Sequence, residues 1–291
     1  MEDVTFLIER MLFKSTGLEL QPFDIKMENG GCINMALSFS TAQGSFFVKW
    51  NELAFADMFE KEAKSLEILN NSEVVVTPNL VGYGTVEEKS FLMLERIESV
   101  SPTINSWELL GRNLAKLHQV RAQKFGLGYN NYIGRLEQNN RPMENWLDFY
   151  RERRLNSQLG LAIYNKFVDE SFVSKFKMFL EKLDQILPDS APCLLHGDLW
   201  NGNVLLTDKT AYLIDPAIYY GAPEMDLAMT RLFGGFPDEF YAAYNELSPI
   251  SNNFEELLDV YNLYSLMVHV NLFGPEAGYL GKVERTIVRY L

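Results

Sequence analysis

The segment CLLHGDLWNGNVLLTDKTAYLIDP, residues 193–216, organises the whole chain. Its short apolar runs flank a polar loop that contains His196, Asp198 and Asn203, and its last run ends at Asp215. Four residues separate Asp198 from Asn203, which is the spacing of the kinase catalytic loop H-R-D-x-x-x-x-N. Carboxylate and amide oxygens are the ligands that Mg²⁺ prefers. The segment therefore predicts a magnesium-assisted phosphotransfer site.

Length and charge limit the classes of protein that the chain can represent. A chain of 291 residues is long for one hydrophobic core, so we expect two lobes. The net charge of -13 argues against nucleic acid or an anionic membrane as the main partner. No apolar run is long enough to span a membrane, and the N-terminus lacks the basic start of a signal peptide, so we expect a cytoplasmic protein. Two cysteines, Cys32 and Cys193, are too few for a disulfide framework.

The N-terminal region reads as a helix at residues 3–15, followed by antiparallel strands in residues 20–49. Gly30, Gly31 and Cys32 lie in a loop between two of these strands, where backbone N–H groups would approach nucleotide phosphates. A Gly pair in a hairpin is usually only a turn. Lys49, at the end of the strand FFVK, favours the phosphate-binding interpretation, because such a lysine contacts the α- and β-phosphates in kinases.

An amphipathic helix at residues 56–69 follows this lysine. A glutamate on the helix would hold the ammonium of Lys49 in place, and both Glu60 and Glu62 are candidates. Glu62 is preferred because it precedes the apolar Leu66 by one turn. The alternative is that both glutamates lie on the exposed face of the helix.

Two further strands surround a turn at residues 87–88, and the second of them contains the run FLMLE. In a kinase-like lobe, the backbone from Glu95 to Ile97 would meet the adenine, and Met93 would lie at the back of that pocket. We therefore expect an α+β, bilobal, protein-kinase-like fold. Residues 1–97 would form a small N-lobe with an antiparallel sheet and one main helix, and residues 98–291 a larger, mostly helical C-lobe.

The C-terminal region supplies long helical patterns and one irregular stretch. Helices are predicted at residues 106–120, 144–160 and 168–187, with Ser106 as the N-cap of the first, and three more follow residue 238. Residues 121–145 have no period but carry several aromatic side chains, which indicates an ordered loop that shapes a pocket wall. His118 and His269 lie beside apolar stripes and are expected to pack. Asp226 is expected to brace the catalytic loop.

Motifs spread along the chain give it a resemblance to a known family. The chain is similar to the fructosamine kinase (ketosamine-3-kinase) family in LLHGDLWNGN, in LIDPAIYYGAPEMDLAM and in LFGGF with FYAAYNE. The more selective parts are ENGGCIN, FGLGYNNYIGRLEQNN and the ending NLFG-x4-YLG. That family belongs to the aminoglycoside-phosphotransferase-like branch of the protein-kinase-like fold. The HGD-x4-N part alone would also fit aminoglycoside or choline kinases, whereas Trp200 in HGDLW is more selective. The departures are small: RLEQNN lacks an expected Pro or Thr, and Pro-Ala follows Asp215 where a protein kinase has Phe-Gly.

The resemblance implies an activity and a role for each site residue. ATP and Mg²⁺ would be the cofactors, and the O3 hydroxyl of a ketosamine (a fructosamine- or ribulosamine-type adduct) would be phosphorylated, which leads to deglycation. Asp198 would accept the hydroxyl proton, while Asn203 and Asp215 hold the metal. Lys49, steadied by Glu62, would bind phosphates beneath the loop at residues 30–32. Trp200 would lay its ring against the sugar.

Alternatives remain open on the sequence alone. The chain could be an aminoglycoside, choline or other small-molecule kinase, or a nucleotide-binding pseudokinase that serves as a scaffold. The scaffold is disfavoured because Lys49, Asp198, Asn203 and Asp215 are all present. The resemblance also implies that Cys32 can form a redox-sensitive disulfide-linked homodimer. The alternatives are a monomer and a bystander thiol that the cytosol keeps reduced.

Overall fold

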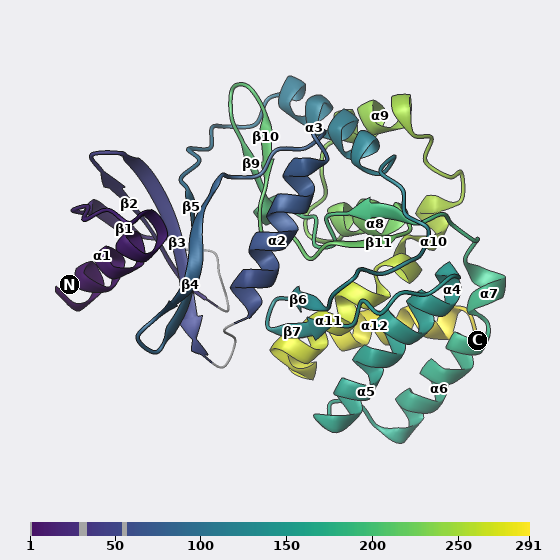
Figure 1. The fold of residues 1–291 in the computed structure, drawn as a ribbon. Coiled ribbons are helices and arrows are strands. Elements are labelled where there is room, and N and C mark those ends of the chain that lie inside the picture. Colours follow the sequence, from purple (N-terminus) through teal and green to yellow (C-terminus); the bar gives the residue numbers. More distant parts are fainter. Residues whose placement is uncertain (1, 29–33, 54–56) are drawn as a thin grey trace. The chain divides into compact units, whose positions relative to one another are not determined.

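The structure is a computed structural model that describes residues 2–28, 34–53 and 57–291. The chain divides into two compact units (Figure 1). Unit 1 consists of Met1–Ser106 and Gly202–Pro216, and unit 2 of Trp107–Asn201 and Ala217–Leu291. The polypeptide therefore passes from one unit to the other three times. Within the described residues, no helix is both long and apolar enough to cross a membrane.

Unit 1 contains the antiparallel sheet that the sequence predicted. Its five strands run in the order β1-β2-β3-β5-β4, and every neighbouring pair is antiparallel. Their bounds are β1 (Phe23–Met27), β2 (Met35–Thr41), β3 (Gly44–Glu52), β4 (Leu80–Val86) and β5 (Lys89–Glu95). Tight turns join β2 to β3 and β4 to β5, as the sequence indicated. The helices α1 (Glu2–Thr16) and α2 (Met58–Asn71) cover the two faces (Figure 1).

The alternation of side chains along β3 decides what each face of this sheet does. Val48 and Trp50 point to the face covered by α1, where they join Leu37, Phe39, Phe91 and Met93 from the sheet and Ile8, Met11 and Leu12 from the helix. Successive side chains in a strand point to opposite faces. Lys49, between Val48 and Trp50, therefore projects toward the face covered by α2.

The second half of the segment 193–216, Gly202–Pro216, belongs to unit 1 and forms a hairpin. It consists of β9 (Val204–Leu206) and β10 (Ala211–Leu213), which are antiparallel. The amide of Leu213 donates to the carbonyl of Val76 at 2.9 Å, and the amide of Val100 donates to the carbonyl of Leu206 at 2.8 Å. These backbone bonds place Asp215, which follows β10, in the same unit as Lys49.

Unit 2 is mostly helical, as predicted. Its helices are α3 (Ile104–Leu117, which starts in unit 1), α4 (Trp146–Phe149), the π-helix η2 (Tyr150–Asn156), α5 (Ser157–Tyr164), α6 (Glu170–Glu181), α7 (Leu183–Ile186), α8 (Glu224–Leu232), α9 (Asp238–Leu247), α10 (Phe254–Tyr261), α11 (Leu263–Phe273) and α12 (Tyr279–Arg289). Short strand pairs complete it: β6 (Asn131–Ile133) with β7 (Leu136–Gln138), and β8 (Cys193–Leu195) with β11 (Tyr219–Gly221).

Two details of these helices differ from the sequence prediction. Thr103, not Ser106, caps α3: its hydroxyl accepts the amide of Ser106 at 3.2 Å, because the helix begins at Ile104, two residues before its predicted start. The second of the three helices predicted after residue 238, over residues 255–274, is divided into α10 and α11 at Asn262. The side-chain amide of Asn262 donates to the carbonyl of Ala228 at 2.9 Å, a tertiary contact that local periodicity cannot show.

Candidate active site

The centre of the site in unit 1 is the ammonium of Lys49. Its Nζ lies 2.6 Å from Oδ1 of Asp215 and 2.8 Å from Oε1 of Glu62, and the lysine is only 5% exposed. The predicted contact between Lys49 and Glu62 is therefore present. Glu60, the competing candidate, is exposed and pairs with Lys64 one turn along α2.

The charges of this triad are strongly coupled. Burial opposes the charged form of Lys49, but attraction from Asp215 and Glu62 outweighs it and holds the lysine pKa above its ordinary value. Burial raises the pKa of Glu62 to about 7, against the opposing effect of Lys49. The lysine is thus cationic at every physiological pH, whereas Glu62 changes its charge near neutrality.

The sheet register places Met93 away from this lysine. Met93 pairs with Val48 across β3 and β5, and it belongs to the core that packs against α1. Directly opposite residues in an antiparallel pair share a face. Leu92, which pairs with Lys49, and Leu94 therefore share the lysine's face. The prediction that Met93 lies at the back of the adenine pocket does not match this placement, because the two faces of the apolar run FLML look alike in the sequence.

The segment after β5 has backbone groups of the expected kind. The amide of Glu95 already donates to the carbonyl of Asn79 at 3.0 Å. The amide of Arg96 donates to the carbonyl of Ser45 at 3.0 Å. Within the described part of the chain, the amide of Ile97 donates no hydrogen bond. Of these three donors, Ile97 is the one left to meet a ligand.

Asn203 and Asp215 fit a hard cation by their chemistry. The amide of Ile214 donates to the carbonyl of Asn203 at 3.1 Å, which ties the residue before Asp215 to Asn203. Asp215 has a φ of +52°, a left-handed conformation that non-glycine residues avoid and that is concentrated at functional sites. Its side chain is 51% exposed. Among the residues described, no cluster of three or more His, Cys, Asp or Glu side chains could hold a metal ion. Two oxygen ligands nevertheless suit Mg²⁺, which usually keeps several waters.

The catalytic loop is held in unit 2 by Asp226. The carboxylate of Asp226 accepts the amide of His196 at 2.7 Å and the amide of Gly197 at 2.8 Å, so the predicted bracing role is confirmed. Gly197 has a φ of +84°, and a Cβ there would lie 2.1 Å from the carbonyl oxygen of Ala217. Only glycine fits at this point, and it directs the next residue, Asp198.

A buried histidine completes this support. Nε2 of His118 lies 3.3 Å from Asp226, and its Nδ1 lies 2.8 Å from the hydroxyl of Tyr244. Burial works against the ionised form of Asp226, but the bond and charge of His118 and the amide of Gly197 hold its pKa below the usual range. His118 is therefore a packed structural residue, as the sequence indicated.

The irregular stretch that was predicted to shape a pocket wall is ordered and tied to the residues after Asp215. Asn131 donates to the carbonyl of Ile218 at 2.9 Å, and Gln138 donates to the carbonyl of Ala217 at 3.0 Å. The hydroxyl of Tyr264 on α11 donates to Gln138 at 2.8 Å. Burial raises the pKa of Tyr264, and the charge of Asp198 acts in the same direction. The β6–β7 hairpin, α11 and Asp198 thus belong to one neighbourhood.

Trp200 is half-buried, and its ring centroid lies 5.9 Å from that of Phe233, which follows α8. Phe233 in turn lies 4.8 Å from the ring of His269 and 6.4 Å from that of Tyr279. Sequence reasoning treated His269 as packing and gave no role to Phe233 or Tyr279. The signals in the sequence are the motif LFGGF, which contains Phe233, and the ending NLFG-x4-YLG, which contains Tyr279.

Three of the predicted nucleotide residues, Gly30, Gly31 and Cys32, lie outside the described residues. Cys193 is buried, and burial raises its thiol pKa, which agrees with an inert cysteine.

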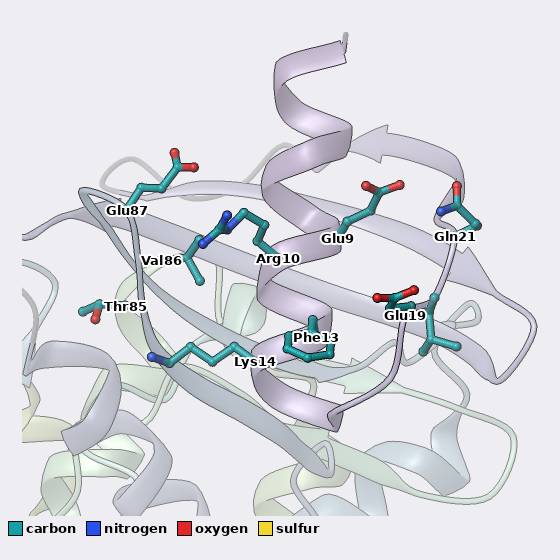
Figure 2. A pocket seen from close by; sticks show the side chains of 10 residues that line it. Glu9, Arg10, Phe13, Lys14, Glu19, Gln21, Thr85, Val86 and Glu87 are labelled. Atoms are coloured by element: carbon teal, nitrogen blue, oxygen red, sulfur yellow. The ribbon is translucent and has the colours of Figure 1, made fainter.

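A separate cavity of about 570 Å³ lies in unit 1 beside α1 (Figure 2). Its wall comes from α1, from the segment before β1 and from the β4–β5 turn, and it consists of Glu9, Arg10, Phe13, Lys14, Glu19, Leu20, Gln21, Thr85, Val86 and Glu87. None of the predicted site residues is among them, so this cavity is distinct from the nucleotide-binding candidates.

Comparison with known proteins agrees with this geometry. The family model for fructosamine kinase matches residues 5–291. The chain is 37% identical to a probable ketoamine kinase of Synechocystis, over 98% of this chain and 96% of that protein. It is 36% identical to the chloroplastic protein-ribulosamine 3-kinase of Arabidopsis thaliana, over 90% of this chain and 81% of that protein.

Solved structures extend the comparison to the fold. A putative fructosamine-3-kinase from Haemophilus somnus superposes with a TM-score of 0.88 at 26% identity, over 99% of both chains. The aminoglycoside phosphotransferase APH(4)-Ia superposes with a TM-score of 0.63 at 14% identity, over 97% of both chains, which shows a shared fold alone. The family match, the close relatives and the kinase-like arrangement of Lys49, Glu62 and Asp215 lead to one conclusion: the chain belongs to the fructosamine kinase family.

Proposed function

We propose that the protein is an ATP-dependent kinase that phosphorylates the O3 hydroxyl of ketosamines. The observation that carries the proposal is the buried ammonium of Lys49, which Glu62 and the half-exposed Asp215 both contact. A strand lysine paired with a helix glutamate, beside an aspartate that can bind Mg²⁺, is the phosphate-binding arrangement of kinases. The names of its relatives, ketoamine kinase and protein-ribulosamine 3-kinase, indicate the acceptor.

Each site residue has one task in the proposed reaction. The O3 oxygen attacks the γ-phosphorus of ATP, a new O–P bond forms, and the bond to the bridging oxygen breaks, so that ADP leaves. Asp198 accepts the proton that O3 releases. Lys49 neutralises the phosphates, and Glu62 holds Lys49 in position. Mg²⁺, held by Asn203 and Asp215, would supply further neutralisation of phosphate charge.

The adenine site belongs to the same proposal. The amide of Ile97 and the carbonyl of Glu95 meet the adenine, and Leu94 replaces Met93 as the side chain behind it, because Leu94 shares the face of Lys49. Gly30, Gly31 and Cys32, which lie outside the described residues, are the proposed contacts of the phosphates. Unit 1, which includes Asn203 and Asp215, then acts as the nucleotide-binding lobe, and unit 2 carries Asp198 and the substrate pocket.

Two further proposals concern the state of the protein in the cell. We infer a cytoplasmic location, with which the low cysteine content of the chain agrees. The chain is either a monomer or a redox-sensitive homodimer linked through Cys32. Measuring oligomeric state and activity with oxidant and with reductant checks the second proposal, and identical values under both conditions contradict it.

The activity is tested with a panel of ribulosamines, fructosamines, aminoglycosides and choline, each with Mg²⁺ and ATP. Phosphorylation of the ketosamines alone is expected. Asp198→Asn should lower kcat by about 10²–10⁴-fold while ATP affinity stays unchanged, because a general base acts only on the acceptor. Asp208→Asn, an exposed aspartate in the β9–β10 turn, is the matched control. Preferential phosphorylation of aminoglycosides or choline, or normal turnover by Asp198→Asn, contradicts the proposal.

A further inference from the structure

Five aromatic side chains of unit 2 form a cluster that begins two residues after Asp198. We call Trp200, Phe233, His269, Phe273 and Tyr279 the ring cluster. His269 is at its centre, with ring centroids 4.8 Å from Phe233, 4.9 Å from Tyr279 and 5.6 Å from Phe273. The rings come from four separate places in the chain: the catalytic loop, the end of α8, α11 and the start of α12.

The ring cluster is not part of the hydrophobic core. None of its five side chains is buried, and Phe273 is 45% exposed. By contrast, the neighbouring α11 residues Leu266, Met267, Val268 and Val270 are all at most 3% exposed. A group of large rings that keep accessible surface beside a catalytic loop has the character of a binding surface.

The central histidine presents an unshared electron pair. Nδ1 of His269 lies 2.7 Å from the carbonyl oxygen of Ser265. A carbonyl only accepts, so Nδ1 carries the proton and Nε2 is left as an acceptor. Partial burial lowers the pKa of His269, against the opposing effect of the bond to Ser265, and the lowered pKa favours the neutral ring. Among the described residues, Nε2 has no hydrogen-bond partner.

These features together suit a small organic cation that carries an N–H group. Aromatic faces attract a cation, and a neutral imidazole nitrogen accepts its hydrogen bond without repelling its charge. A ketosamine has such a group: its C1 amine is protonated near neutral pH and lies two carbons from C3. The two residues from Asp198 to Trp200 span at most about 7 Å of backbone, which keeps the cluster within reach of the same substrate.

We propose that the ring cluster binds the protonated amine of the ketosamine and that Nε2 of His269 accepts a hydrogen bond from it. The inference rests on the proposed function and adds the part of the substrate that is recognised. It assigns a common purpose to two motifs of the sequence, HGDLW and NLFG-x4-YLG, because the fold brings their aromatic residues together. His269 and its neighbouring rings then select a sugar that carries an amine over the plain sugar.

The test compares two substrates that differ in one atom. One is a ketose with an alkylamino group at C1, and the other is the ether with oxygen in place of that nitrogen, which has neither charge nor N–H. The wild-type enzyme should prefer the amine in kcat/KM by about ten-fold or more, as expected for a hydrogen bond to a charged group. His269→Phe, which keeps a ring and removes the acceptor, should abolish most of this preference by raising KM for the amine alone.

The control variants separate recognition from folding. His269→Gln retains an acceptor and should recover part of the preference. Tyr164→Leu removes an exposed aromatic side chain (83% exposed) from another helix of unit 2 and should change neither substrate's KM. The wild-type ratio is informative even if His269→Phe does not fold. Equal kcat/KM for amine and ether in the wild type, or equal loss for both in His269→Phe, overturns the inference while leaving the ketosamine kinase activity established. Failure of the wild type to phosphorylate the amine overturns the proposed function itself.

Discussion

At the scale of single residues, the triad of Lys49, Glu62 and Asp215 could be predicted because each member has a fixed place in a strand, a helix or a loop. Glu62 was distinguished from Glu60 by helical spacing alone, and the ion pair with Lys49 agrees. Met93 was misplaced for the opposite reason. In a fully apolar strand both faces look alike in the sequence, and only the pairing of Val48 with Met93 shows which face is which.

The raised pKa of Glu62 gives a prediction about stability and pH. Its pKa is about 7 in the folded protein against an ordinary value of 4.5, so between these values the folded state binds more protons than the unfolded state. The free energy of unfolding should therefore fall as pH rises through this window. Glu62→Gln cannot ionise and should remove this contribution. Urea denaturation of both proteins across the window measures the difference.

The matched control for this prediction is Glu60→Gln on the same helix. Glu60 is exposed and pairs with Lys64 in solvent, so the variant should keep the pH dependence of the wild type. Identical pH slopes for the wild type and Glu62→Gln would show that burial does not raise this carboxyl's pKa.

At the scale of elements, the helical segment at residues 146–164 changes its helix type in the middle, which the sequence pattern did not predict. Its middle, Tyr150–Asn156, is a π-helix. Arg154 within it is fully buried and lies over the faces of Phe149, Tyr219 and Tyr264, with its guanidinium carbon 4.0 Å from the Tyr219 ring centroid. The sequence pattern has arginines between the apolar residues of this segment, and it does not indicate which arginine side chain is buried.

Arg154 also fastens the β6–β7 region to this helix. It donates to the carbonyl of Asn139 at 2.7 Å and to the side chain of Asn140 at 2.8 Å. Arg154→Lys loses the planar fork that reaches both acceptors, and we expect it to destabilise the protein by about 1.5–3 kcal/mol. Urea denaturation measures the loss, and hydrogen exchange should speed up at Asn131–Gln138. Arg141→Lys, at an exposed position, should change neither; equal stability of the two variants contradicts the anchoring role.

At the scale of the whole molecule, the sequence predicted a small sheet-bearing part and a larger helical part but treated them as successive segments. Unit 1 instead recruits Gly202–Pro216 from the middle of the chain. Two backbone hydrogen bonds hold this segment, one from Leu213 to Val76 and one from Val100 to Leu206. The residue types at these four positions do not indicate that their backbone groups pair. Sequence patterns predict helices and strands from side chains. The association of Gly202–Pro216 with unit 1 depends on backbone hydrogen bonds, so the sequence could not predict it.

This arrangement predicts that the N-terminal segment cannot bind nucleotide alone. A polypeptide of residues 1–106 lacks Asn203 and Asp215, so Lys49 loses its partner at 2.6 Å and the expected metal ligands are gone. Isothermal titration should show no binding of Mg²⁺ and ATP at concentrations that saturate the whole chain. Joining residues 202–216 to this segment through a flexible glycine-serine linker should recover binding, since it restores the β9–β10 hairpin and Asp215. The same joined polypeptide with Lys49→Ala is the control and should not bind. If residues 1–106 alone bind as tightly as the whole chain, the hairpin is dispensable and the nucleotide site does not depend on Asp215.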